Sequence, residues 1–156
     1  MEPSLLQALL EASTEAALKA LIQTQSLSLQ TVAALKARSA EFYFDQPAEA
    51  LRLAEAALRL GELLPAPAPA LGRWALGNAL LFLDRYQEAV EQFSQARALY
   101  LVAGMPLEAA RMGVGQVGAL AYTGRFEEAL ALAVEIEPVL DAAAKGDPQR
   151  DRKSVV

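Results

Sequence analysis

Cysteine and histidine are both missing from the sequence, and aromatic residues make up only 6% of its 156 residues. The chain therefore has no disulfide, thiolate nucleophile, imidazole base or zinc site of the usual kind. The acidic residues form no clustered metal-binding motif, so we expect neither a metal nor a cofactor. Because these groups carry much of enzyme chemistry, we expect the protein not to be an enzyme.

Positive charge and long apolar runs are also scarce. The net charge is −5 and the isoelectric point is about 4.8, and no basic stripe is present, so we expect no nucleic-acid partner. The apolar run near the N-terminus is short and lacks the preceding basic segment of a signal peptide. No apolar run is long enough to span a bilayer, so we expect no membrane span and place the chain in the cytoplasm.

Alanine and leucine dominate what is present, and 54% of the residues are hydrophobic. These two residues are among the strongest helix formers, whereas a β protein needs more β-branched and aromatic residues. The composition therefore predicts an all-α protein.

A long internal repeat organises the chain. Three similar segments contain Ala50, Ala89 and Ala129, which are almost evenly spaced along the sequence. Small or apolar residues recur four and seven positions later in each segment, which is the spacing of one helix face. Another helical pattern precedes each segment, so each repeat is predicted to be a hairpin of two helices.

The helical patterns predict eight helices. We expect Pro47 and Pro106 to lie in the first turns of their helices, and Asp45 and Asp84 to cap helices, Asp84 with Gln87 as a capping box. The alternating prolines of Leu64 to Pro69 predict a stiff extended linker. The predicted helices span residues 4–11, 14–24, 29–44, 47–62, 70–83, 86–102, 106–122 and 126–143.

The predicted organisation has three parts. Residues 1–27 form an N-terminal helical cap, and residues 28–144 form three repeats over 28–64, 69–104 and 105–144. Residues 145–156 have no apolar periodicity, so we expect a disordered tail.

The second repeat contains a set of mostly small and apolar residues at Leu76, Gly77, Asn78, Ala79, Leu80, Tyr86, Gln87, Glu88, Ala89, Phe93 and Ala96. With these residues it resembles the tetratricopeptide repeat (TPR). The resemblance implies an α-solenoid, a right-handed superhelix of antiparallel helix hairpins whose concave face binds peptides or proteins. Repeat one has Arg38 where the pattern has Gly, and repeat three has Gln116 and Val117 where it has Leu and Gly. The spacing between the repeats is also longer than the period typical of this family.

Repeats of this longer period are similar to those that precede the caspase-like CHAT domain in bacterial proteins. Residues 35–58 and 103–111 carry this likeness. Such proteases are expected to use a Cys/His pair, which this chain lacks, so the resemblance implies only a non-catalytic regulatory or sensor arm of a longer protein.

The candidate binding residues lie mainly on the predicted helix 70–83, which is apolar on two sides. Leu76, Leu80 and Leu83 share one face, and a nearly opposite face could bind a peptide or a partner protein. The alternative is that Trp74 and Phe82 pack against flanking repeats. The candidate face comprises Trp74, Asn78, Leu81 and Phe82, joined by the residues at similar aligned positions, Lys36, Ser39, Tyr43, Arg111 and Tyr122.

The segment from Gly113 to Gly118 matches the GxGxxG pattern of dinucleotide sites, which keeps a nucleotide-binding enzyme as a third possibility. That motif requires a preceding strand, whereas a helix start after Pro106 precedes it here. The alternative is close helix packing at the glycines. The paired acids around Glu127, Glu128 and Glu135 are expected to form a solvated face rather than a catalytic pair.

The last predicted helix also has an apolar patch outside its packing face, formed by Leu130 and Val134. Repeat arrays normally end in a polar capping helix. We therefore expect the chain either to be a fragment or to self-associate through this C-terminal helix.

Overall fold

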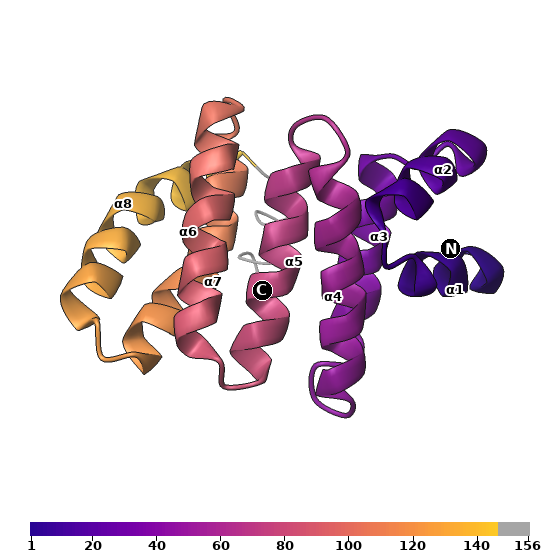
Figure 1. Cartoon of the computed structure of the whole chain (residues 1–156). Helices are drawn as coiled ribbons and strands as arrows, with labels where there is room; N and C mark the ends of the chain where they lie inside the picture. Colours follow the sequence, from indigo (N-terminus) through magenta and orange to yellow (C-terminus); the bar gives the residue numbers. More distant parts are fainter. Residues whose placement is uncertain (147–156) are drawn as a thin grey trace, which may run out of the picture.

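A computed structural model describes residues 1–146, and all regular secondary structure within this range is α-helical. Two short helices at the N-terminal end precede six longer ones that lie side by side (Figure 1). No helix in this range is long and apolar enough to cross a membrane. The eight helices are α1 (Pro3–Glu11), α2 (Glu15–Gln25), α3 (Leu29–Ala40), α4 (Pro47–Glu62), α5 (Ala68–Phe82), α6 (Tyr86–Val102), α7 (Pro106–Tyr122) and α8 (Phe126–Lys145).

Local sequence explains where several helices begin. Thr14 accepts a hydrogen bond from the Ala17 amide at the start of α2, and Ser28 forms a capping box with Thr31 at the start of α3. Proline occupies the first turn of α4 and α7, as predicted for Pro47 and Pro106, because a missing N–H costs nothing there.

The two predicted aspartate caps are wrong. Gln46 and Arg85 hold the cap positions of α4 and α6, and neither side chain caps the helix. Asp84 instead adopts a left-handed backbone conformation, with φ at 59°. An aspartate with positive φ ends the preceding helix, so its carboxylate is not placed to cap the following one.

Asp84 belongs to a type of turn that follows α5 and recurs after α6 and α7. Gly104 and Gly124 take the same left-handed conformation, with φ values of 70° and 77°. After each of these three positions, the next backbone amide donates to a carbonyl near the end of the preceding helix, as Arg85 does to Leu80 at 3.0 Å. This closure of the helix end makes the connection short and reverses the chain.

The segment between α4 and α5 is not the predicted extended linker. The amide of Ala68 donates to the Pro65 carbonyl at 3.1 Å, and Pro69 already lies in the first turn of α5. The turn brings two glycines to the contact of the helices. A Cβ on Gly61 would lie 2.6 Å from the Ala68 oxygen, and one on Gly72 would lie 2.7 Å from the Ala57 oxygen. The backbones of α4 and α5 therefore touch directly.

Phe93 of α6 is the largest fully buried side chain and joins three helices. Its ring lies where a Cβ on Gly77 of α5 would come within 2.6 Å and one on Gly115 of α7 within 2.9 Å. Both glycines therefore make room for the ring, and α5, α6 and α7 form one continuous core.

The predicted boundaries differ from the structure at two further places. Helix α3 ends at Ala40, and residues 41–45 form a turn that contains Tyr43. Helix α8 continues to Lys145, so the predicted disordered tail falls almost entirely on residues 147–156, which lie outside the described residues.

Candidate functional site

The structure brings four of the predicted binding residues together in two contacts between α3, the turn after it, and α5. The Lys36 ammonium lies 4.0 Å from the centre of the Trp74 ring. The Tyr43 and Phe82 rings are stacked, with their centres 4.4 Å apart. Because α3 pairs with α4 and α5 pairs with α6, one surface combines side chains from two successive hairpins.

A residue missed by the sequence analysis extends this surface. Phe44 meets the Phe82 ring edge-on at 5.1 Å and is 84% exposed. The signal for it was the run Phe42 to Phe44, three aromatics together in a chain with few. We call Lys36, Tyr43, Phe44, Trp74, Asn78 and Phe82 the aromatic surface.

Partial burial perturbs two ionisable groups of the aromatic surface. Burial lowers the pKa of Lys36, because loss of water disfavours its charged form. Burial likewise raises the pKa of Tyr43, and the neighbouring side chains of Asn78 and Ser39 act in the opposite direction. Asn78 therefore lies near the Tyr43 hydroxyl, which is buried without a hydrogen-bond partner in residues 1–146, on the same part of α5 as the aromatic rings.

The other predicted residues do not join this group. Ser39 is fully buried, and its hydroxyl donates to the Ala50 carbonyl at 2.7 Å, so it ties α3 to α4. Leu81 is partly buried against the core. Arg111 pairs with Glu108 at 3.2 Å, and Tyr122 stacks on Tyr86 at 4.6 Å. These contacts leave Arg111 and Tyr122 as separate exposed features of α7.

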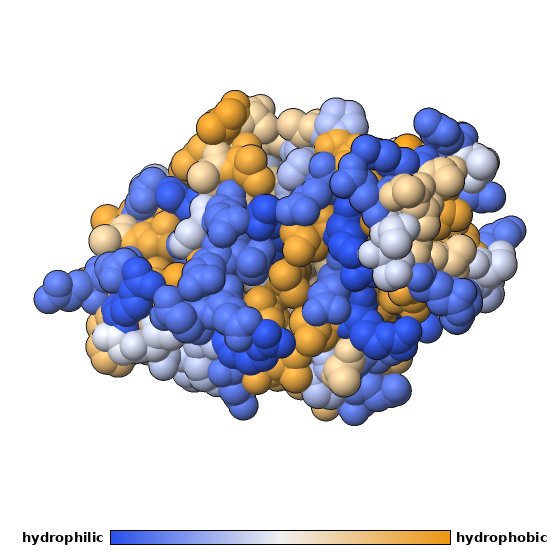
Figure 2. All heavy atoms as spheres, in the orientation of Figure 1, coloured by the Kyte–Doolittle hydropathy of each residue, from blue (hydrophilic) through white to orange (hydrophobic). Residues whose placement is uncertain are grey.

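Figure 2 shows the face of the molecule formed by α4, α5 and α6. Apolar residues form a strip along α5 between the largely hydrophilic surfaces of α4 and α6.

Trp74 also contacts the core, since its ring meets the buried Tyr100 ring edge-on at 6.2 Å. Trp74 therefore packs between α6 of its own hairpin and the Lys36 side chain of α3.

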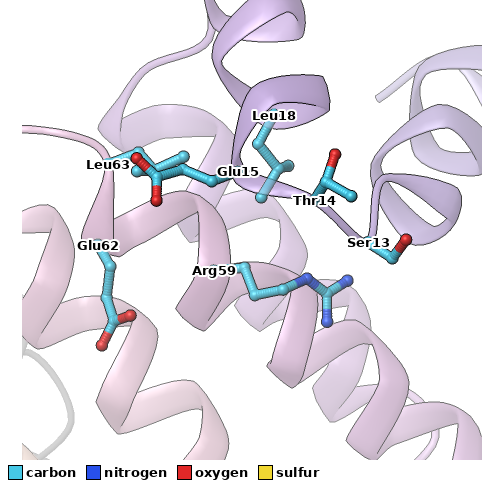
Figure 3. A pocket seen from close by; sticks show the side chains of 7 residues that line it. All are labelled: Ser13, Thr14, Glu15, Leu18, Arg59, Glu62 and Leu63. Carbon is cyan, nitrogen blue, oxygen red and sulfur yellow. The ribbon is translucent and has the colours of Figure 1, made fainter.

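A second candidate is a small pocket of about 150 Å³ between α2 and α4. Figure 3 shows the Arg59 side chain extending from α4 toward the segment that carries Ser13 and Thr14. Two carboxylates line the same pocket, and each has its own cation: Glu15 pairs with Lys19 at 2.5 Å and Glu62 with Arg73 at 2.6 Å. The acidic lining opposes the binding of an anion to Arg59, so this pocket supports no site.

The glycine-rich segment from Gly113 to Gly118 lies in the middle of α7, and no strand precedes it in residues 1–146. Gly113 and Gly115 face the side chains of Ile136 and Phe93. The strand and turn that would place a pyrophosphate at a helix start are therefore missing there, and close helix packing accounts for these two glycines.

Two acidic residues of α8 form ion pairs with arginines. Glu128 pairs with Arg125 at 2.6 Å, and Glu135 pairs with Arg97 of α6. These carboxylates lie on exposed helix surfaces and do not converge. Over residues 1–146, no three acidic side chains come together as a metal site.

Comparison of the chain with protein-family models, with curated proteins and with solved structures finds no match.

Proposed function

We propose that the protein is a non-enzymatic protein-interaction module with the architecture of a TPR-like α-solenoid. The support is the repetition of its parts. From α3 onward each helix packs mainly against its neighbours in the chain, and turns of one kind recur at Asp84, Gly104 and Gly124. A stack of such hairpins forms a right-handed superhelix with an extended surface for a partner.

The observation that carries the proposal is the exposure of a joined group of aromatic rings. Phe44 projects into solvent while its ring edge contacts Phe82, which in turn stacks on Tyr43. Rigid aromatic side chains contribute large contact area at low entropic cost, and they are enriched among the residues that dominate binding energy.

The chemistry of the aromatic surface favours an extended peptide segment with an apolar side chain. That side chain would pack on Phe44 and Phe82, which bury apolar area when covered. The Asn78 amide can donate to and accept from a peptide backbone at the same time. Lys36, held over Trp74, would attract a nearby carboxylate of the ligand.

A display selection with random peptides on the intact chain tests this proposal. We expect selected peptides to lose at least about tenfold in affinity for the Phe44→Ala variant, because an exposed aromatic anchor contributes more than about 1.4 kcal/mol. Asn78→Ala should weaken binding to a smaller extent and leave the melting temperature nearly unchanged.

Phe126→Ala is the matched control. Phe126 is 67% exposed at the start of α8, far along the chain from the aromatic surface, so its removal should leave peptide affinity unchanged. Peptides whose affinity is the same for the wild-type chain and for Phe44→Ala would disprove the assignment of the surface. A large loss of stability in Asn78→Ala would instead assign Asn78 a structural role.

A further inference from the structure

The outer side of the last hairpin carries a second apolar surface, separate from the aromatic surface. Between α7 and α8 lies a shallow hollow of about 330 Å³, and apolar residues also reach the surface at the α8 end in Figure 2. Beside it, Leu130 is 67% exposed and Val134 is 62% exposed, as the sequence predicted for this patch. The hollow is lined by Val114, Val117, Ala133, Ile136, Leu140, Glu137 and Asp141.

The preceding hairpin shows what covers such a surface. Val90 is the counterpart of Leu130 in that hairpin, and it is only 4% exposed because α7 and α8 follow α6. Helix α7 is held there partly by Gln116, whose amide donates to Ser94 at 3.0 Å. Val134 on α8 is the counterpart of Ser94 on α6. A helix that covers the open surface must therefore contact a valine at the position where α7 contacts a serine.

The polar lining of the hollow is acidic. Glu137 and Asp141 lie one helical turn apart on α8, a spacing at which like charges repel one another. Ion pairs join helices at two other places: Arg73 of α5 pairs with Glu62 of α4, and Arg97 of α6 pairs with Glu135 of α8. Glu137 is the counterpart of Arg97 in the last repeat, so here the chain supplies the anion and an occupant must supply the cation.

We propose that this end of the molecule is a docking surface for a basic amphipathic helix of a partner protein. The helix would resemble α5 and α7, which have 15 and 17 residues. It would present small and medium apolar residues to the hollow, an apolar residue to Val134, and lysine or arginine to Glu137 and Asp141. Such helix-in-groove docking buries apolar area, and the charges select the partner.

Synthetic peptides with the sequence of residues 106–122 are suitable probes, because α7 itself covers the equivalent surface of α5 and α6. All peptides carry Gln116→Leu to match Val134. The basic peptide adds Glu108→Lys, and the acidic peptide adds Arg111→Glu. On the intact chain we expect the basic peptide to bind about fivefold tighter than the acidic one, with the difference reduced by salt.

Variants of the protein complete the test. Val134→Lys should weaken the basic peptide by at least about tenfold, whereas Val102→Lys, at a valine that is 89% exposed on the end of α6, should change the affinity by less than about twofold. The double change of Glu137→Lys and Asp141→Lys should reverse the preference between the two peptides.

Two results would overturn the proposal. One is equal binding of the basic and acidic peptides. The other is a chain that is dimeric in light scattering and becomes monomeric with Val134→Lys, since that would assign the surface to a second copy of the chain. Both are independent of the Phe44 test, which concerns a different surface.

Discussion

Helices α6 and α8 carry the same repeat motif in successive hairpins, but their surroundings differ. In α6, Val90 and Phe93 are buried between the helices before and after it. In α8, Leu130 is exposed and Ala133 borders an open hollow. Within one repeated motif, the position of Val90 and Leu130 is therefore buried only where another helix follows, whereas that of Ala89 and Ala129 is buried in both helices because it faces the preceding helix.

The largest expected loss of stability follows substitution of Phe93. Phe93→Ala should lower the free energy of unfolding by about 3–5 kcal/mol, since it empties a fully buried site between three helices. Urea unfolding followed by circular dichroism measures this change. Phe126→Ala, which removes an exposed ring at the start of α8, should cost less than about 0.5 kcal/mol. Similar losses of unfolding free energy for the two variants would contradict the difference in burial between Phe93 in α6 and Phe126 in α8.

Two glycines should respond to alanine with opposite signs. Gly72→Ala places its Cβ 2.7 Å from the Ala57 oxygen and 2.9 Å from the Leu58 Cα, and backbone atoms cannot rotate away. The expected loss is about 1–3 kcal/mol in the same unfolding measurement. Gly118→Ala meets no neighbouring atom within 4 Å, so its better helix propensity should stabilise the chain by up to about 1 kcal/mol. Destabilisation by Gly118→Ala would show that this side of α7 is more tightly packed.

The difference in stability contributed by the equivalent positions Val90 and Leu130 can be measured by alanine substitution. Val90→Ala should cost about 1–2 kcal/mol, because it removes two buried methyl groups. Leu130→Ala removes a larger side chain but should change stability by less than about 0.5 kcal/mol, because Leu130 is already in solvent. A larger cost at Leu130 would mean that α8 is covered in solution, and light scattering at the same concentration would detect a second copy.

The smallest expected effect is a pH dependence at the turn before α6. The Tyr86 hydroxyl donates to the Asp84 carboxylate at 2.5 Å, and this hydrogen bond raises the pKa of Tyr86 from 10 to about 12. Because the folded-state pKa is the higher one, the stabilisation is fully present below pH 10 and is lost as the pH rises from 10 to about 12. Titration by ultraviolet absorbance should show that the pKa of one tyrosine falls in Asp84→Asn, while the raised pKa values of the partly buried Tyr43 and the buried Tyr100 stay as they are in the wild-type chain. Tyr86 titrating near 10 in the wild-type chain would rule out the hydrogen bond in solution.

Much of the helical pattern could be predicted because it depends on local spacing and composition. Eight helices were expected and eight are found in residues 1–146, most with ends close to the prediction. The main errors fall at turns. Asp84 has the composition of a cap but a left-handed conformation, and the prolines of Leu64 to Pro69 form a compact turn because Gly61 and Gly72 let α4 and α5 meet. Both arrangements depend on how the neighbouring helices pack, which capping preference and proline spacing by themselves do not describe.

The candidate surface was predictable only in part. Alignment of the repeats placed Lys36, Tyr43, Trp74 and Phe82 on corresponding helices, and the structure brings them into contact. The same alignment included Ser39, which is buried. Aligned sequence positions do not show whether a side chain is exposed or faces the adjacent helix. Phe44 was missed because the predicted helix 29–44 included it, whereas it lies in the turn after α3.

The sequence by itself determined the all-helical composition of the described chain, the long period of the repeat and the apolar stripe of each helix, since all three follow from residue spacing along the chain. Only the tertiary structure decided which apolar residues are buried. The physical reason is that burial depends on the neighbouring helix: Gly77 and Gly115 make room for Phe93, whereas Leu130 and Val134 have no helix to cover them within residues 1–146.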